Sequence, residues 1–255
     1  MKGVLENSLF ETQPHKFEHL NELARQFATI YCGNSIVKDN IFAVIENYAR
    51  KKEIHLEILR FPIHDEELWA MTFLKKGTIF VCVNSELALC KQFFAAAHEL
   101  YHIYCYVEDA DQSYIKNGSI LDSDTANETG KTQEDVEANA FAGLLLMPDQ
   151  LLSNQIDLFG IDKDDMDTDS VLSLMDMFAI PYKATVLRLY ESNCIKRHKA
   201  EELFRVTAED VAKRVELTGK AKRWQLDGSG TESFGTLLEK ADYLSLIHIS
   251  EPTRR

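Results

Sequence analysis

Apolar residues between positions 16 and 50 recur at steps of three and four, a spacing typical of amphipathic helices. A turn at Cys32-Gly33-Asn34 separates a first helical stretch from a second one around Ile36 to Tyr48. The pattern predicts an N-terminal helical segment over residues 1–50. The first helix carries its apolar stripe on Phe17, Leu20, Leu23, Ala24, Phe27 and Ile30.

The apolar period then changes to two. Residues 54–59 alternate between apolar and other side chains, which predicts a strand. Two further apolar runs, 68–74 and 78–83, are joined by Lys75-Lys76-Gly77. A short loop with glycine between strand-like runs predicts a hairpin. We therefore expect a small antiparallel sheet in this part of the chain.

Helical patterns return after residue 86. A strong helix is predicted from about Leu87 to Tyr106, and another from near Thr132 to Met147, where Pro148 ends it. The polar, acidic residues 108–130 between them are typical of a loop or lid. The fold class is therefore α+β, with the sheet packed on helices. Further helical stretches follow an acidic linker at 162–169 and cover residues 171–178, 183–192 and 200–215.

Composition narrows the class of protein. The 255 residues are 45% hydrophobic, which allows a full-sized core. A net charge of −13 disfavours direct contact with nucleic acid. No run approaches the length of a membrane span, and the first fifteen residues lack the apolar stretch of a signal peptide. Five scattered cysteines without a C-x-x-C pair are typical of buried thiols in a reducing compartment. We expect a cytoplasmic protein.

The last twelve residues, LSLIHISEPTRR at 244–255, need a separate interpretation. They resemble one reading frame of a transposon-end adapter used in sequencing libraries. We interpret them as an adapter-derived artefact and leave them, with His248, out of the fold and the site. A genuine short tail is the alternative.

The residues that carry chemistry begin with H-E-x-x-H at His98 to His102. On a helix, positions 98 and 102 lie one turn apart on the same face, so both imidazoles can bind one Zn²⁺. Glu99 beside them can act as general base towards a water molecule. The alternative is a histidine pair on an ordinary amphipathic helix. Apolar residues on both sides of this helix predict that it is buried, and buried imidazoles need partners.

A catalytic zinc usually has three protein ligands, so a third must come from elsewhere. The helix at 132–147 starts with carboxylates, and its small residues permit close approach to another helix. The candidates are Glu134, Asp135 and Glu137. Asp135 has a second interpretation as a helix cap, because Thr132-x-x-Asp135 resembles a capping box. Asn139 is expected to hydrogen-bond His98 or His102.

The H-E-x-x-H sequence, followed by E-A-N-x-F-A-x-x-L-L-M-P at 137–148, resembles the ImmA/IrrE family of metallo-endopeptidases. The similarity extends from about Leu56 to Leu189. It implies a thermolysin-like (zincin) core over 51–195, followed by a C-terminal helical extension over 196–243. It also implies zinc as cofactor, with Asp135 as third ligand where most members have Glu.

Two further details follow from the same resemblance. Tyr101 replaces a frequent glycine, which we interpret as a change at the surface or just behind the ligands. The strand at 78–83 is expected at the sheet edge, where an extended peptide can pair with it. Independently of the resemblance, Arg188 is a candidate for orienting a substrate carbonyl, with an ion pair on the helix surface as the alternative. Four other histidines lie outside any ligand spacing and are expected on the surface or in a strand: His15, His19, His55 and His64.

The resemblance implies a zinc-dependent endopeptidase that hydrolyses a peptide bond in a protein substrate. A helix-turn-helix, DNA-binding repressor of a mobile element or stress response is the expected partner. One alternative is a non-proteolytic regulator that binds and sequesters a repressor. Another is a sensing module in which zinc is structural.

Overall fold

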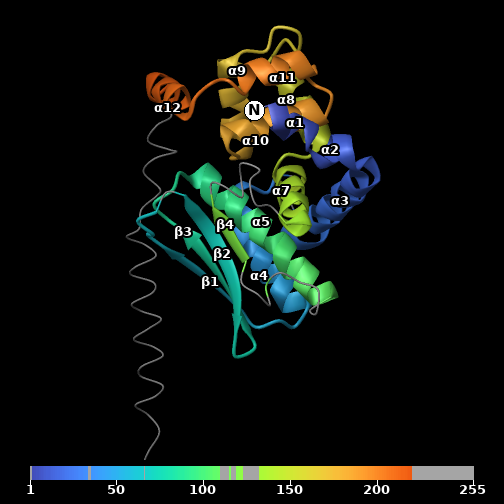
Figure 1. Cartoon of the computed structure of the whole chain (residues 1–255), viewed down its shortest axis with the longest axis vertical. Coiled ribbons are helices and arrows are strands. Elements are labelled where there is room, and N and C mark those ends of the chain that lie inside the picture. Colours follow the sequence, from blue (N-terminus) through green and yellow to red (C-terminus); the bar gives the residue numbers. More distant parts are fainter. Residues whose placement is uncertain are drawn as a thin grey trace, which may run out of the picture.

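The computed structural model describes residues 2–33, 36–65, 67–109, 115, 119–122 and 132–219. A sheet is covered on one face by helices, and a further group of helices lies at one end of the molecule (Figure 1). The α+β class predicted from the sequence is confirmed. The helices are α1 (Lys2–Glu6), α2 (Leu9–Thr12), α3 (Pro14–Phe27), α4 (Ile41–Lys51), α5 (Leu89–Glu108), α7 (Gln133–Leu146), α8 (Asp149–Leu158), α9 (Thr168–Phe178), α10 (Tyr182–Glu191), α11 (Arg197–Leu203) and α12 (Ala208–Leu217).

The N-terminal helices follow the predicted apolar stripe with one exception. Phe17, Leu20 and Phe27 on α3 are buried as expected, whereas Ile30 is 49% exposed. Ile30 lies in a π-helical turn, Ala28–Cys32, that follows α3 directly. A π turn holds more residues than an α turn, so it rotates Ile30 away from the stripe. Gly33, with φ of +70°, then ends the helix in the left-handed region.

The sheet has four strands in the order β1-β3-β2-β4. Their bounds are β1 (Leu56–Phe61), β2 (Leu68–Lys75), β3 (Thr78–Asn84) and β4 (Ser119–Asp122). β2 and β3 form the predicted hairpin, in which Lys75 pairs with Thr78. Both loop residues, Lys76 and Gly77, have positive φ, as a two-residue type I′ turn requires. β4 lies within the range 108–130, which the sequence predicted as a loop.

Two predictions about the sheet are wrong. It is mixed and not purely antiparallel, because β1 runs parallel to β3 while the other pairs are antiparallel. In addition, β3 is an inner strand that pairs with β1 on one side and β2 on the other. Its residues Ile79, Val81 and Val83 are fully buried, as expected for a central strand. β3 therefore offers no free edge to a peptide, and among the described strands β1 and β4 lie at the edges.

α5 is the central helix of the covering layer. It packs against β2 and β3 on one side and against α7 on another, and α7 in turn contacts α3. Ala95, Ala96 and Ala97 are fully buried, which lets neighbouring elements approach closely. Because α5 is enclosed in this way, its polar residues are buried too, as the apolar residues on both of its sides predict.

The C-terminal helices α8 to α11 gather with α1 at the end of the molecule away from the sheet (Figure 1). The helix predicted over 200–215 is two helices, α11 and α12. Thr207 begins α12 because its side chain accepts a hydrogen bond from the Asp210 backbone N–H. One continuous set of buried apolar side chains extends from Leu5 to Val215. The predicted artefact at 244–255 lies outside the described residues.

The structure also tests what the sequence indicated about the cysteines and about membrane-spanning helices. All five cysteines are free, and Cys82, Cys90 and Cys194 are buried. In the described part of the chain, no single helix is long and apolar enough to cross a membrane. The bent pair of α9 and α10, with 98° between the two helices, passes the same test by length and composition alone.

Candidate metal centre

His98 and His102 lie one turn apart on α5, and both side chains are fully buried. Their Nε2 atoms are 3.0 Å apart. Helical geometry places them on one face of α5, and this face is turned into the fold. The two ring nitrogens therefore face a common point inside the fold.

Asp135, in the first turn of α7, completes this arrangement. Its Oδ1 atom is 3.4 Å from the Nε2 of His102 and 3.9 Å from the Nε2 of His98. Ligand atoms bound at 2.0–2.1 Å to a tetrahedral zinc lie about 3.3 Å from each other. Two nitrogens and one carboxylate oxygen at these separations fit such an ion. Within the described residues, no other group of three His, Cys, Asp or Glu side chains is gathered for a metal in this way.

The other nitrogen of each imidazole has its own partner on α7. The Nδ1 of His98 is 3.0 Å from the Asn139 side-chain oxygen. The Nδ1 of His102 is 2.6 Å from the Glu134 carboxylate. With an acceptor at each Nδ1, one proton of each ring is held there, and Nε2 is the nitrogen left for the centre. The structure thus gives Asn139 the contact expected from the sequence.

Glu134 is a contact that the sequence analysis missed, since it considered Glu134 only as a possible ligand. A buried histidine needs a partner for its second nitrogen, and that requirement predicts an acceptor near His102. The sequence contains no signal that selects this acceptor among the three carboxylates of the segment 134–137.

Glu137, the other candidate, is not part of the group formed by the histidines and Asp135. Its carboxylate accepts hydrogen bonds from the Tyr101 hydroxyl at 2.6 Å and from Gln133 at 3.1 Å. It also pairs with Lys16 on α3 at 3.0 Å. Tyr101 is only 3% exposed, so its interpretation as a surface residue is wrong. Tyr101 and Glu137 instead connect α5 and α7 to the N-terminal helix α3.

The two interpretations of Asp135 are compatible, because its two oxygens have different contacts. Oδ2 accepts hydrogen bonds from the backbone N–H and the hydroxyl of Thr132, at 3.0 and 2.7 Å. The first of these bonds, together with the Asp135 backbone N–H that donates to the Thr132 hydroxyl at 3.2 Å, forms the capping box predicted from the sequence. Oδ1 is the atom that approaches the histidines. One carboxylate thus caps α7 and reaches the centre.

The electrostatics of the centre favour a cation. Burial lowers the pKa of His102, but hydrogen bonds to Asp135 and Glu134 and the charge of Glu99 raise it to about 9. Burial raises the pKa of Asp135, but hydrogen bonds from His102 and Thr132 outweigh it and hold that pKa below its usual value. At neutral pH the metal-free chain therefore keeps a proton among these groups.

Glu99, the expected general base, is fully buried on α5 between the two histidines in sequence. Its charge contributes to the raised pKa of His102 and, after burial, to the raised pKa of Cys82 on β3. The carboxylate is thus close to the centre and to the sheet beneath it.

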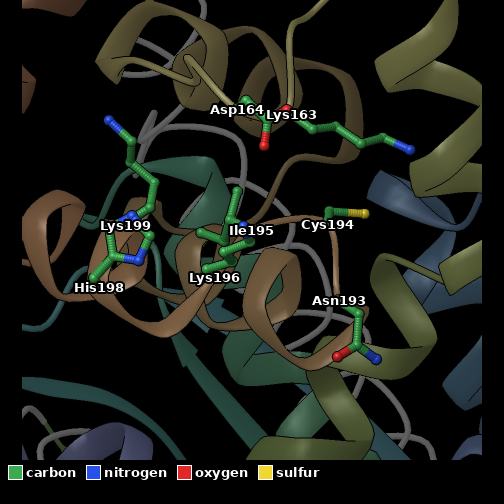
Figure 2. A pocket seen from close by; sticks show the side chains of 8 residues that line it. All are labelled: Lys163, Asp164, Asn193, Cys194, Ile195, Lys196, His198 and Lys199. Atoms are coloured by element: carbon green, nitrogen blue, oxygen red, sulfur yellow. The ribbon is translucent and has the colours of Figure 1, made fainter.

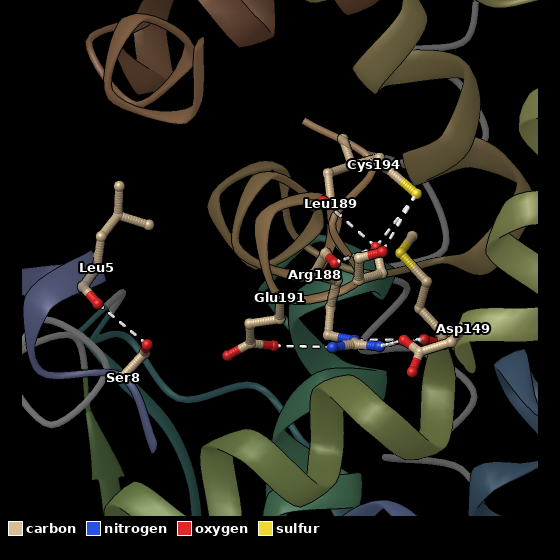
Figure 3. A network of polar contacts seen from close by, with 9 residues as sticks. Leu5, Ser8, Asp149, Arg188, Leu189, Glu191 and Cys194 are labelled. Carbon is tan, nitrogen blue, oxygen red and sulfur yellow. Dashed lines mark hydrogen bonds and ion pairs between the residues drawn. The ribbon is translucent and has the colours of Figure 1, made fainter. Parts of the chain in front are cut away.

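Arg188 does not belong to this centre. Its guanidinium donates to the backbone oxygen of Met147, at the end of α7, and to Glu191 at 2.9 Å. Asp149 lies on the other side of the guanidinium (Figure 3). Of the two roles considered for Arg188, the ion pair is found, but its expected position on the helix surface is wrong because Arg188 is buried. His15, His19, His55 and His64 are all exposed, as expected.

A separate pocket of about 370 Å³ lies at the junction of α10 and α11. None of its lining residues belongs to the metal centre. Three lysines line it, but the side chains of Lys163 and Lys199 point away from one another (Figure 2). Their charges therefore do not converge on one point inside the pocket.

The comparisons with known proteins agree with this geometry. A search of the curated proteins found no match to the chain. The model of the IrrE N-terminal-like domain, a peptidase family, matches residues 51–190, which is more than half of the chain. The matched range contains every residue of the candidate centre and confirms the resemblance drawn from the two motifs. The chain therefore belongs to the metallopeptidase family of the IrrE N-terminal-like domain.

Proposed function

We propose that this protein is a zinc-dependent endopeptidase with His98, His102 and Asp135 as metal ligands and Glu99 as general base. One observation carries the proposal: the Nε2 atoms of both histidines and the Oδ1 of Asp135 converge in a buried site. The peptidase family supports hydrolysis as the reaction.

Asp135 is preferred over its neighbours because of the atoms that each carboxylate contacts. Glu134 bonds the Nδ1 of His102, the nitrogen that faces away from the centre. Glu137 is engaged by Tyr101 and Lys16. Two nitrogens and one oxygen form the donor set of a catalytic zinc, which keeps a further position for water or substrate.

Zinc held there would supply Lewis-acid chemistry, lowering the pKa of water and polarising a peptide carbonyl. The chain's own residues would do the rest. Glu99 takes a proton from the attacking water and returns it to the leaving amine. Asn139 and Glu134 fix the orientation of the two imidazoles, so little reorganisation accompanies the reaction.

The substrate is proposed to be a protein, as the peptidase family implies. The resemblance to ImmA/IrrE proteins supports a helix-turn-helix repressor of a mobile element or stress response. A net charge of −13 fits a partner recognised as protein and disfavours direct contact with DNA.

The decisive experiment compares the wild type with Glu99→Gln. Both should contain about one zinc per chain by elemental analysis, because Glu99 is not a ligand. Hydrolysis of an unfolded test protein such as casein, and of a repressor encoded next to this gene, should fall by about 10²- to 10⁴-fold in the variant. Mass spectrometry of the products would identify the cleaved bonds.

Two outcomes would reject this proposal. Wild-type protein that holds no zinc and gains none on titration has no metal centre. A Glu99→Gln variant that inactivates the repressor as well as the wild type does, without cleavage, would favour the sequestering regulator.

A further inference from the structure

The four-residue pattern Thr-x-Glu-Asp occurs at the start of two helices. It begins α7 at Thr132–Asp135 and α12 at Thr207–Asp210. Both copies form a capping box in which the threonine hydroxyl accepts from the aspartate N–H, at 3.2 and 3.1 Å. In both, the same hydroxyl donates to the aspartate Oδ2, at 2.7 and 2.6 Å. The local geometry is therefore nearly the same.

The surroundings of the two copies differ. At α12, Asp210 is exposed and Glu209 forms a surface ion pair with Lys213 at 2.7 Å. At α7, the side chain of Asp135 is 4% exposed and its Oδ1 faces the two histidines. The α12 copy thus serves as a helix cap alone, and it provides a reference for what a cap contributes.

We propose that Thr132 is a positioning residue for the metal centre, holding Oδ2 of Asp135 so that Oδ1 points at the site of the ion. This inference rests on the proposed function, because it assumes that Asp135 is a ligand. It assigns to Thr132 a role beyond starting the helix.

The physical argument concerns the freedom of the aspartate side chain. Asp has only two side-chain torsions. When two hydrogen bonds from Thr132 fix Oδ2, the direction in which Oδ1 points is therefore almost fully determined. A ligand that is already oriented loses less conformational entropy when the ion binds. The Asp135 side chain is short enough for its second oxygen to bond the backbone N–H of Thr132, three residues earlier, at 3.0 Å.

The departure from the family pattern has a consistent explanation in this arrangement. Most relatives are expected to have Glu at this position, which is one methylene longer and has one more torsion to fix. With Asp at 135, the shorter reach is compensated by a carboxylate that Thr132 holds in place. Thr132 and Asp135 therefore act together, and a substitution at either residue should weaken metal binding.

The test compares Thr132→Ala with Thr207→Ala in the full chain. Each variant loses one capping box, so both should lower the melting temperature of the metal-free protein by a similar amount. The zinc dissociation constant, measured by competition with a chromophoric chelator, should rise about tenfold or more in Thr132→Ala. In Thr207→Ala it should stay within about twofold of the wild type, since that cap touches no ligand.

Two more variants separate positioning from folding. Thr132→Ser keeps the hydroxyl donor and should restore wild-type zinc affinity. Thr132→Val keeps the size of the side chain without the hydroxyl, and it replaces Thr132→Ala if the alanine variant fails to fold. The loss of zinc affinity in Thr132→Val should match the loss expected for Thr132→Ala. Thr207→Val is the matched control and should keep the affinity of the wild type.

The outcomes distinguish this inference from the function on which it rests. Zinc binding by the wild type with equal affinities in the Thr132 and Thr207 variants would overturn the positioning role and leave the metal centre intact. A wild type that binds no zinc would remove the proposed function itself.

Discussion

The two ends of α7 contain buried charged clusters that balance their charge in different ways. At its C-terminal end, the guanidinium of Arg188 is a permanent cation that bonds the Met147 oxygen and Glu191. At its N-terminal end, carboxylates surround imidazoles whose charge depends on a bound proton. Both ends complement the helix dipole, with anions at the start and a cation at the end.

The difference bears on which cluster we propose to be functional. A cluster that contains its own permanent cation, as Arg188 provides for Glu191 and Asp149, needs no bound ion to pair its buried carboxylate. A cluster of carboxylates and imidazoles that converge on one point is complete only with a proton or a metal ion. The comparison therefore supports the proposal of a metal centre at the His98 cluster, and we expect the Arg188 cluster to contribute stability.

The largest expected effect concerns the N-terminal end of α7, where the His98 cluster lies. His98→Ala or His102→Ala should abolish zinc binding, because a site with only two ligands cannot hold the ion tightly. Elemental analysis after dialysis measures the bound metal. Arg188→Ala is the matched control at the other end of α7, and its folded fraction should keep about one zinc per chain. Stoichiometric zinc in either histidine variant would contradict the assignment.

The next largest effect concerns the C-terminal end of α7, where the Arg188 cluster lies. Arg188→Ala should lower the free energy of unfolding by about 3–5 kcal/mol, because it leaves a buried carboxylate without its cation. The carboxylate is that of Glu191, whose side chain is 3% exposed. Urea denaturation of the metal-free protein measures the loss. If the free energy of unfolding fell by less than about 1 kcal/mol, the value of an exposed ion pair, the Arg188 cluster would not contribute the stability expected here.

Much of the fold followed from the apolar pattern, because each helix or strand is set largely by nearby residues. The hairpin at Lys76-Gly77 and the helix holding His98 and His102 were predicted for local reasons. The parallel pairing of β1 with β3 was not, since a strand's period says which face is buried and not which strand is its neighbour. The edge position expected for β3 came from the family resemblance, and the apolar pattern of the strand could not test it because the pattern does not identify neighbours.

The centre shows the same division between local and distant information. The histidines share a helix, so their spacing alone predicts a shared face. The choice among Glu134, Asp135 and Glu137 depends on how α7 is rotated against α5, which their spacing does not reveal. The family resemblance pointed to Asp135, and the atomic contacts then gave each carboxylate a different partner.

A third prediction concerns pH and depends on the raised pKa of His102, about 9 compared with an ordinary 6.5. Below pH 9 zinc must displace the proton, so affinity should rise with pH by about tenfold per unit for one proton and level off above pH 9. Calorimetry at pH 7 in buffers of different ionisation enthalpy should detect about one proton released per zinc.

The metal-free protein should respond to pH in the opposite sense. A histidine whose pKa is raised by folding contributes stability that is complete below its unfolded pKa near 6.5 and is lost as pH rises through 9. Metal-free melting temperatures should therefore fall between pH 6.5 and 9, whereas His102→Ala should not show this fall. A flat profile in the wild type would contradict the proton-holding arrangement.

The smallest effect tests how tightly the C-terminal end of α7 packs against Arg188. A Cβ atom added at Gly143 would lie 2.9 Å from the Cδ and 3.4 Å from the Cγ of Arg188. Arg188 cannot easily move aside, because its guanidinium is bonded to Met147 and Glu191. Overpacking of this kind costs about 1–3 kcal/mol, whereas the change from glycine to alanine inside a helix gains about 1 kcal/mol. Gly143→Ala should therefore destabilise the wild type by up to about 2 kcal/mol.

The same substitution should change sign when Arg188 is absent. In an Arg188→Ala background the Cγ and Cδ atoms are gone, so only the gain in helix propensity remains. Gly143→Ala should then stabilise the protein by about 1 kcal/mol. The two backgrounds form a double-mutant cycle whose coupling energy isolates the contact between α7 and α10. Stabilisation by Gly143→Ala in both backgrounds would mean that Arg188 moves aside freely. The C-terminal end of α7 would then be no more constrained than an ordinary helix surface.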